Sequence, residues 1–407
     1  MVSAARTAAL LLVVLLGATA GAVAQAPAPD GVQAPAATTD GHVTPSNTTA
    51  VLRSAAGGRA EFVSPSVDLS VALGGQRADL DARFRTYALN ERYETSDSAA
   101  GRRALLSASL DRVEDRLGDV TADERRTRRA YVNGTTTGAD YLATLSRLSA
   151  TAGELQRRLT QVQNYARRVP DTQRIEQRAA RDEAELVMLQ GPVRARATEA
   201  FEGTSRPDRF YLAASRTGVA LSRLDDRNGT YVREAADRAN FRPAVQTRPS
   251  EREMLDRIDA LYPWGWNHSS HVFSESGRGI YRVVITHDHG QLTAYIDGST
   301  RNVFSEVQTK FVGGLPTGPG TAVRRGDGAL AVNRTYPGGP LRVLATNATG
   351  APRDAVVRVN GTVVGETGDD GVLWTVGPSG QYVVSATTPD GETVTLIARA
   401  VEDDQAA

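Results

Sequence analysis

Four of the five histidines lie close together in the sequence, at His268, His271, His287 and His289. Histidine is the commonest metal ligand in proteins, and the His-x-x-His and His-x-His spacings are plausible parts of a zinc site. One hypothesis is therefore a weak metal site formed by His287 and His289 with Asp288. The alternative hypothesis is that these polar residues belong to ordinary turns.

The spacing of the histidines argues against a single site with four ligands. A strand is expected at residues 279–286, and it spans roughly 25 Å. The first histidine pair precedes this strand in a loop, and the second pair follows it in a turn. One site would require the preceding loop to fold back along the whole strand. We therefore predict turn polarity, without a metal or another cofactor, and retain only His287 and His289 as weak metal candidates.

Other residues that could do chemistry form no known catalytic pattern. The chain has no cysteine, which excludes a thiolate nucleophile, a thiolate metal site and a disulfide. It contains no G-x-S-x-G elbow, H-E-x-x-H helix or G-x-x-x-x-G-K-[ST] loop. Asp225 and Asp297 are predicted to cap the turns that follow two strands. We therefore expect no catalytic residue and predict that the protein is not an enzyme.

Trp264 and Trp266 form a second unusual pair, just before the histidines. Indole rings can stack on a sugar or a peptide, and they can equally anchor a loop onto a hydrophobic core. We favour the anchor, because such residues more often hold a loop onto a core.

The composition limits the classes of function. Lysine plus arginine and aspartate plus glutamate each number 47, which excludes a strongly basic nucleic-acid binder and a polyacidic tail protein. Lys310 is the only lysine, and we attribute the bias toward arginine to a GC-rich genome. A chain of 407 residues has room for about two to four domains.

The N-terminus is typical of a secretory signal peptide at residues 1–24. Arg6 is followed by an uncharged apolar stretch, and Ala22-Val23-Ala24 forms an A-x-A cleavage site. The alternative is an uncleaved anchor, since the apolar stretch is barely long enough to span a membrane. We predict that the mature chain begins near Gln25. Intact-mass analysis of the secreted protein that still finds residues 1–24 would contradict this prediction.

Most asparagines lie in N-x-[ST] sequons, the acceptor sequence for N-glycosylation. Seven of the 11 asparagines do so, whereas the serine and threonine content predicts roughly two by chance. The excess predicts a glycoprotein, and the alternative is that Asn-Gly-Thr is simply favourable in turns. Both interpretations expect exposed side chains. The seven positions are Asn47, Asn133, Asn228, Asn267, Asn333, Asn347 and Asn360.

Hydrophobic spacing predicts helices over residues 67–201. Apolar residues recur there at alternating steps of three and four, which is typical of packed, coiled-coil-like helices. The segment around Asn133 interrupts the pattern, so we expect an antiparallel helical hairpin with Asn133 at its tip. An earlier helix through Leu80, Phe84 and Tyr87 is expected to pack on this hairpin.

The period changes over residues 202–311, where strands are expected. The prediction is three short strands, a helix at residues 250–262 with an S-x-x-E capping box, and three more strands. Residues 72 positions apart match in the two strand triplets, which indicates an internal repeat of two αβββ units. A sheet edge or a groove between the units could bind an extended peptide by strand addition. The matching pairs are Gly218 and Gly290, Leu224 and Ile296, Asp225 and Asp297, and Glu234 and Glu306.

Residues 250–307 resemble a PepSY-type module. The resemblance rests on Leu261-Tyr262-Pro263 at the end of the helix, on the strand Tyr295-Ile296-Asp297-Gly298, and on Val303-Phe304. It implies a non-catalytic module linked to protease inhibition or periplasmic interaction. The whole layout also resembles uncharacterised secreted proteins of halophilic archaea, although the neutral composition departs from the acidic one usual in halophiles.

Two segments are predicted to be linkers and one to be a separate domain. Residues 25–66 are rich in Ala, Pro, Thr and Gly, and residues 312–321 are rich in Gly and Pro. Beyond them, short alternating runs separated by turns such as Asn360-Gly361 predict an all-β sandwich at residues 322–401. This segment resembles Ig-like or carboxypeptidase-regulatory-like domains, which carry no active site.

The sequence thus predicts a multidomain α+β protein made of a coiled-coil-like helical hairpin, two PepSY-like αβββ units and a C-terminal all-β sandwich. We expect a secreted, cell-surface glycoprotein that acts as a non-catalytic interaction or structural module. Its expected partner is an extracellular protein or a cell-envelope component, without nucleic-acid binding and without a membrane span in the mature chain. The alternative is a regulator or inhibitor of an extracellular protease, and a weak metal-binding or enzymatic role is the third hypothesis.

Overall fold

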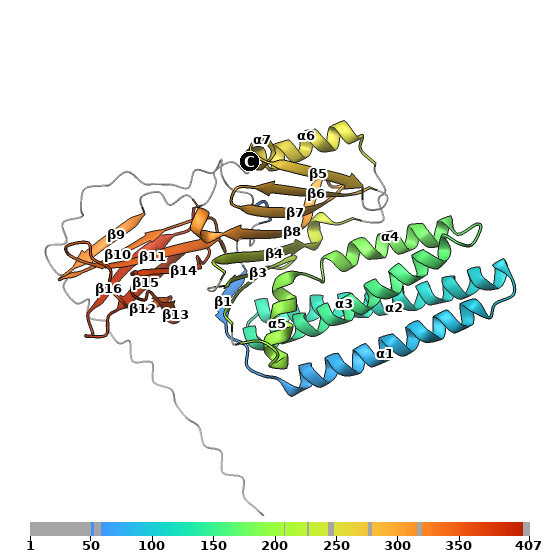
Figure 1. Ribbon diagram of the computed structural model, residues 1–407, viewed down its shortest axis with the longest axis horizontal. Helices are drawn as coiled ribbons and strands as arrows, with labels where there is room; N and C mark the ends of the chain where they lie inside the picture. The colour runs from blue at the N-terminus through green and yellow to red at the C-terminus, as the bar shows by residue number, and fades with distance from the viewer. Residues whose placement is uncertain are drawn as a thin grey trace, which may run out of the picture. The chain divides into compact units, whose positions relative to one another are not determined.

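A computed structural model describes residues 50–52, 58–206, 208–225, 228–242, 248–275, 279–315 and 320–401 (Figure 1). The predicted signal peptide, Asn47 and most of the predicted linker at residues 25–66 lie outside the described residues. No helix in the described ranges is both long and apolar enough to cross a membrane.

The first part of the chain is helical, as predicted. It contains α1 (Leu69–Glu94), α2 (Ala99–Val132), α3 (Gly138–Ala166), α4 (Gln173–Val187) and α5 (Pro192–Glu202). The side chains of Asp68, Ser98 and Thr137 each accept a backbone N–H from the first turn of α1, α2 and α3, respectively. Such caps satisfy N–H groups that have no partner inside the helix, and they fix where each helix begins.

The alternating apolar residues of α2, α3 and α4 form one buried core. Leu110 and Val113 of α2 lie in it with Leu155 and Leu159 of α3. The turn between α2 and α3 follows Asn133, which is exposed. The predicted helical hairpin is therefore present, and its hydrophobic spacing marks the side that is buried.

The packing of α1 differs from the prediction. Leu80, Phe84 and Tyr87 were expected to contact the hairpin, but all three are exposed. The helix instead packs through smaller residues on its opposite side, including Ala82, and through Leu89. Because both sides of α1 carry apolar residues, the spacing alone could not identify the buried one.

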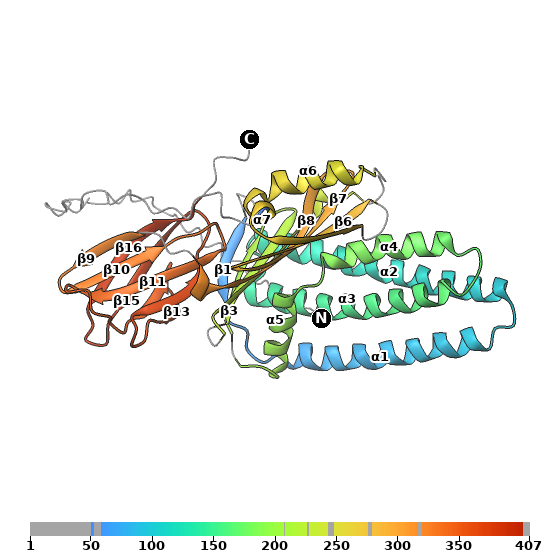
Figure 2. The ribbon, with the colours of Figure 1, turned by 45° about the horizontal axis from the view of Figure 1, so that its top comes forward.

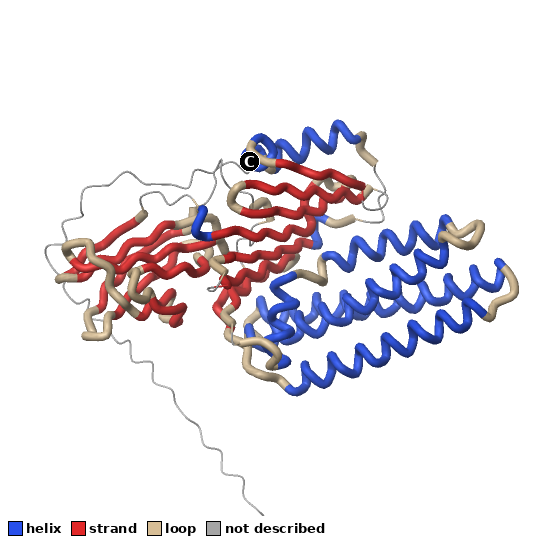
Figure 3. The backbone as a smooth tube through the Cα atoms, in the orientation of Figure 1, coloured by secondary structure: helices blue, strands red, loops and turns tan. Residues whose placement is uncertain are grey.

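The middle of the chain forms one eight-stranded antiparallel sheet, which we call the central sheet (Figure 3). Its strand order is β1-β2-β3-β4-β8-β7-β6-β5. The first four strands are β1 (Arg59–Val63), β2 (Phe210–Ala214), β3 (Gly218–Asp225) and β4 (Thr230–Asp237). The other four are β5 (Ser270–Glu275), β6 (Ile280–His287), β7 (Gly290–Asp297) and β8 (Asn302–Phe311).

The internal repeat is visible in the order of the strands. Each half of the central sheet runs from an edge strand to a central strand, and β4 and β8 pair antiparallel where the halves meet. The strands β3 and β7 begin and end 72 residues apart. The two halves are thus related by an approximate two-fold axis between β4 and β8. They continue one sheet rather than packing face to face, so the predicted groove between two units does not form.

A bulge in β8 changes which residues of the two halves correspond. The register of β7 and β8 shifts next to Tyr295, so β8 gains one residue relative to β4. Ser222 of β3 pairs with Arg233, and its counterpart 72 residues later, Ala294, pairs with Glu306. The structural counterpart of Glu306 is therefore Arg233, and the sequence match of Glu306 with Glu234 is wrong by one position.

Helices cover opposite faces of the two halves of the central sheet (Figure 2). On one face, α5 packs on β2, β3 and β4 through residues such as Val193 and Phe201. On the other face lies α6 (Glu251–Leu261), which packs on β6 and β7 through Met254 and Ile258. The capping box predicted for Ser250 and Glu253 is present at the start of α6.

Several elements were missing from the prediction. The strand β1 lies inside the segment expected to be a linker, where it extends the central sheet beside β2. A short helix, α7 (Pro263–Asn267), directly follows α6, and β5 occupies residues that were expected to form a loop. Two short 3-10 turns, η2 (Arg238–Asn240) and η3 (Val312–Gly314), follow the central strands β4 and β8.

The last part of the chain is an all-β sandwich, as predicted. One sheet has the order β14-β11-β10-β9 and the other β13-β12-β15-β16, with a shared core that includes Val343 and Val384. The hairpin of β9 (Thr321–Arg325) and β10 (Gly328–Asn333) was not predicted. The remaining strands are β11 (Pro340–Asn347), β12 (Val356–Val359), β13 (Thr362–Glu366), β14 (Val372–Val376), β15 (Gln381–Thr387) and β16 (Thr393–Arg399).

Candidate functional site

Three of the clustered histidines surround one indole ring. Trp264 of α7 stacks with His268 and His289, whose ring centroids lie 5.7 Å and 5.6 Å from its own. His287 meets the same indole edge-on at 5.1 Å. A similar contact lies nearby, where Trp266 of α7 stacks on His271 with ring centroids 3.7 Å apart. We call Trp264, His268, His287 and His289 the Trp264 cluster.

The two histidine pairs were expected to lie at opposite ends of a strand, and this prediction was wrong. The segment before β6 does fold back along the whole strand, because β5 pairs antiparallel with β6 and places Ser270 opposite Thr286. His268 therefore returns to the end of β6 where His287 lies. The expected loop position is also wrong for His271, which is an exposed residue of β5.

The contacts within the Trp264 cluster are between aromatic rings. The backbone N–H of His289 donates to Nδ1 of His287 at 3.2 Å, so the proton of the neutral His287 ring lies on Nε2. That Nε2 is buried without a hydrogen-bond partner. Within the described ranges, no group of three or more histidine, cysteine, aspartate or glutamate side chains is placed to hold a metal ion.

Burial makes His287 a poor base. Loss of water around the ring, and to a smaller extent the nearby charges of Lys310 and His289, lower its pKa to about 4. The unfolded chain keeps a pKa near 6.5. The unfolded state therefore binds more protons between pH 6.5 and 4, and His287 costs stability as the pH falls through this range.

We expect His287→Asn to make the protein less sensitive to acid. The wild-type protein should lose about 2–3 kcal/mol of unfolding free energy between pH 6.5 and 4 through His287, and the variant should not. Denaturation at a series of pH values checks this. His271→Gln is the matched control, because its ring is exposed on β5. Equal pH slopes for the wild type and His287→Asn would contradict the prediction.

A second polar cluster lies buried at the centre of the central sheet, on the face covered by α6. Glu306 accepts hydrogen bonds from Tyr262 at 2.9 Å and from Gln308 at 2.7 Å, and it pairs with Arg233 at 3.1 Å. Arg233 and Glu306 are 1% and 0% exposed. With Lys310, these residues form what we call the Glu306 network.

The Glu306 network joins segments that are distant in the sequence. Its carboxylate accepts the backbone N–H groups of Val51 and Leu52, and Arg233 donates to the Leu52 carbonyl oxygen. The hydroxyl of Tyr336, between β10 and β11, donates to Gln308 at 3.0 Å. One carboxylate on β8 therefore links the segment before β1, the sheet, the end of α6 and the C-terminal domain.

The only lysine of the chain belongs to this network. Lys310 is buried, and its ammonium group lies 4.7 Å from the centre of the Tyr336 ring. Burial lowers its pKa to about 7; the charge of Glu306 opposes this shift, and the charge of Arg233 adds to it. The sequence shows that Lys310 is the only lysine, and we attributed this to genome composition alone.

We expect Lys310 to resist amine-reactive reagents in the folded protein. At pH 8 most of its amine is unprotonated, so an accessible Lys310 would react faster than an ordinary lysine. Burial should prevent this, and labelling by a succinimidyl ester should reach only the terminal amine. In urea one further adduct should form at Lys310, which peptide mapping identifies. An adduct at Lys310 in the folded protein at the rate of a free amine would contradict the prediction.

Another buried carboxylate, Glu234, lies on the opposite face of the central sheet. It accepts the backbone N–H groups of Val193 and Arg194 at the start of α5, and it pairs with the Arg194 side chain at 3.1 Å. A carboxylate is favourable at a helix N-terminus, where the backbone N–H groups point outward. Burial raises the pKa of Glu234, and the Arg194 charge opposes that shift. Glu234 thus fastens α5 to β4.

The sequon asparagines fall into two groups by exposure. Asn133, Asn228, Asn267 and Asn360 are exposed, whereas Asn333 and Asn347 are partly buried. Asn347 also accepts three hydrogen bonds within its own turn. The capping role predicted for Asp297 is present, because its carboxylate accepts the N–H groups of Ser299 and Thr300. Exposure therefore favours the first group as glycan acceptors.

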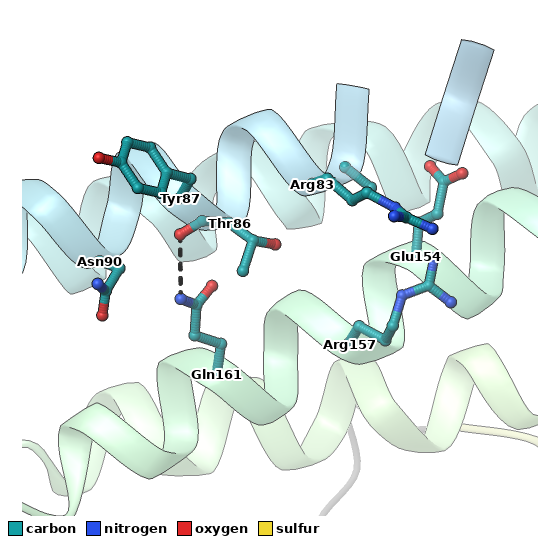
Figure 4. A pocket seen from close by; sticks show the side chains of 8 residues that line it. Arg83, Thr86, Tyr87, Asn90, Glu154, Arg157 and Gln161 are labelled. Atoms are coloured by element: carbon teal, nitrogen blue, oxygen red, sulfur yellow. Dashed lines mark hydrogen bonds between the residues drawn. The ribbon is translucent and has the colours of Figure 1, made fainter. Parts of the chain in front are cut away.

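A groove of about 710 Å³ lies between α1 and α3 (Figure 4). It is lined by Tyr87 of the first helix together with polar and charged side chains such as Arg83, Glu154 and Arg157. The amide of Gln161 donates to the Thr86 carbonyl oxygen at 3.2 Å and bridges the two helices. The sequence did not predict this groove. We expected Phe84 and Tyr87 to pack against the hairpin, and such packing would have left no open space beside α3.

Comparison with protein families assigns all three parts of the chain. Residues 210–316 match a family of unknown function (DUF7094), and residues 320–395 match an archaeal fibronectin-III type-like domain, which agrees with the Ig-like prediction. No PepSY family is among the matches, so that resemblance stays a hypothesis. No curated protein matches the chain. Residues 3–206, half of the sequence, match the domain of unknown function DUF7096, and the chain therefore belongs to the DUF7096 family.

Proposed function

We propose that this protein is a secreted, glycosylated cell-surface protein that acts as a non-catalytic interaction or structural module. The observation that carries the proposal is the exposure of four sequon asparagines in different parts of the fold. Asn133 follows α2, Asn228 lies between β3 and β4, Asn267 ends α7, and Asn360 lies between β12 and β13. A fibronectin-III-like C-terminal domain supports the same role.

The Glu306 network supports a structural role. Its buried polar groups bind one another and distant backbone groups, and they hold the C-terminal domain to the sheet through Tyr336 and Gln308. A second link is the hydrogen bond from Ser222 to the Gly338 carbonyl oxygen at 2.9 Å. Links of this kind favour a structural role, in which the central sheet and the C-terminal domain are held together. We also propose that the helical hairpin packs through a coiled-coil-like seam.

Fractionation and glycan mapping of the native protein test this role. We expect the protein in the envelope or medium fraction, with glycans on Asn133, Asn228, Asn267 and Asn360 and lower occupancy at Asn333 and Asn347. Aspartate formed at a sequon by enzymatic glycan release marks each occupied site. Recovery of the unglycosylated protein in the cytosolic fraction would overturn the proposal.

A specific observation also favours regulation of an extracellular protease by a PepSY-like half. The strand β5 pairs only with β6 among the described strands, so its outer edge is open for strand addition by a peptide. Val272 on this strand is exposed. This is the edge that a PepSY-like inhibitor of residues 250–307 would offer to a protease or its propeptide.

Binding to secreted proteases of the same organism tests this alternative. Val272→Lys should weaken binding, because a charged side chain on an edge strand opposes strand addition. Ile397→Lys is the matched control, since Ile397 is an exposed hydrophobic residue of another edge strand, β16. Equal effects of the two variants, or no binding by the wild type, would remove the alternative.

A further inference from the structure

One side of α1 is apolar and exposed. Leu69, Leu73, Leu80, Phe84 and Tyr87 are each 64–73% exposed, and we call them the α1 stripe. At 100° per residue they fall within an arc of about 60°, whereas the buried residues Val71, Ala82 and Leu89 lie about 180° away. The helix therefore has one apolar side inside the protein and a second one outside.

The α1 stripe has the size of a protein interface. Five large side chains at this exposure present on the order of 600–700 Å² of mainly apolar surface, which exceeds the largest patch of a typical monomer. Each partner of a standard interface contributes about 800 Å². Figures 1 and 2 both show α1 as the outermost helix of the bundle, with no other helix or strand drawn on that side. Such a surface is costly unless another protein covers it.

We propose that the α1 stripe is a homodimer interface, in which α1 of one copy packs antiparallel against α1 of a second copy. Leu73, Leu80 and Tyr87 are seven residues apart, the spacing of a seam between two helices. A two-fold axis makes one stripe complementary to itself without any further partner. This inference does not depend on the proposed surface role.

The antiparallel arrangement follows from the residues in the stripe and beside it. In a parallel pair, Arg83 would lie against Arg83 of the other copy, and the two like charges would repel. In an antiparallel pair centred on the stripe, Leu69 faces the larger Tyr87 and Leu80 lies near the axis. A membrane surface is a poorer occupant, because the polar side of α1 carries Asp81 as well as Arg85 and is not basic.

Single cysteines provide a direct test, since the chain has none of its own. With a short bismaleimide linker, Leu80→Cys should cross-link to itself in high yield. Leu69→Cys and Tyr87→Cys should each fail alone, because the two copies of each residue lie about 27 Å apart in the antiparallel pair. A mixture of these two variants should cross-link. Asp81→Cys, which lies outside the stripe, is the matched control and should not react with itself.

Sedimentation of the full chain supplies the second readout. The wild type should sediment with twice the mass of one chain at micromolar concentration, and Leu80→Arg with Phe84→Asp should be monomeric while its circular dichroism spectrum stays that of the wild type. Retention of the dimer in this double variant would overturn the proposal. A monomeric wild type would also overturn it, whether or not the wild type pelleted with lipid vesicles. Self-linking by Leu69→Cys alone would contradict the antiparallel arrangement.

Discussion

Replacing Glu306 with glutamine should lower the free energy of unfolding by about 3–5 kcal/mol. Glutamine keeps the volume of the side chain and one oxygen that can accept the N–H of Val51. It removes the carboxylate that pairs with Arg233 in the described part of the chain, and it leaves that buried guanidinium without this counter-charge. Denaturation followed by tryptophan fluorescence measures the loss, because Trp264 and Trp266 lie on α7, directly after Tyr262.

A double-mutant cycle separates the ion pair from the other contacts of Glu306. Arg233→Met should also be strongly destabilising, since it leaves the Glu306 carboxylate buried without its charged partner. The double variant Arg233→Met with Glu306→Gln should lose much less than the sum of the two single losses, with a coupling energy of about 1–3 kcal/mol. Glu91→Gln, an exposed glutamate of α1, is the matched control and should change stability by less than about 0.5 kcal/mol.

A small loss for Glu306→Gln, similar to that of Glu91→Gln, would show that water reaches the Glu306 network. The contacts to Val51 and Leu52 would then contribute little to holding the segment before β1. In that case the proposed link between the sheet and the C-terminal domain through Gln308 and Tyr336 would also lose its main support. The result therefore tests the structural role as well as the ion pair.

Local periodicity predicted the helices and most of the strands, because helix and strand periods are properties of neighbouring residues. It could not choose between the two apolar sides of α1. Leu80 and Phe84 are larger than Ala82, but the smaller residue allows the close approach to α3 that the bundle uses. Burial depends on the neighbouring helix, which the pattern within α1 does not describe.

The candidate sites depended on pairings that sequence spacing does not contain. The strand β5 pairs back on β6, and this places His268 beside His287 against our expectation. The bulge in β8 makes Arg233, not Glu234, the counterpart of Glu306. A fixed offset of 72 residues cannot reveal one inserted residue inside a strand. The single lysine, Lys310, was the one signal of the buried network that the sequence offered.

The helical hairpin carries the other large expected effect. Leu155→Asp should destabilise the helical part of the chain by at least about 4 kcal/mol, because it places a carboxylate in the core shared by α2, α3 and α4. The core around Leu155 is apolar, with Leu110, Leu159 and Leu186 among its members. The aspartate must either stay protonated or bring water into the seam, and both weaken the packing.

Circular dichroism during denaturation measures this effect, since α1–α5 contain most of the helix in the described chain. Thr160→Asp is the matched control: it adds the same charge to the same helix, five residues further on, at an exposed position. The control should change the midpoint little, whereas Leu155→Asp should shift it strongly toward lower denaturant. Because α1 packs on this bundle through Leu89, which belongs to the same core, loss of the core should also disrupt the proposed dimer. Equal midpoints for the two aspartate variants would mean that the alternating apolar residues of α3 do not form the seam between the helices.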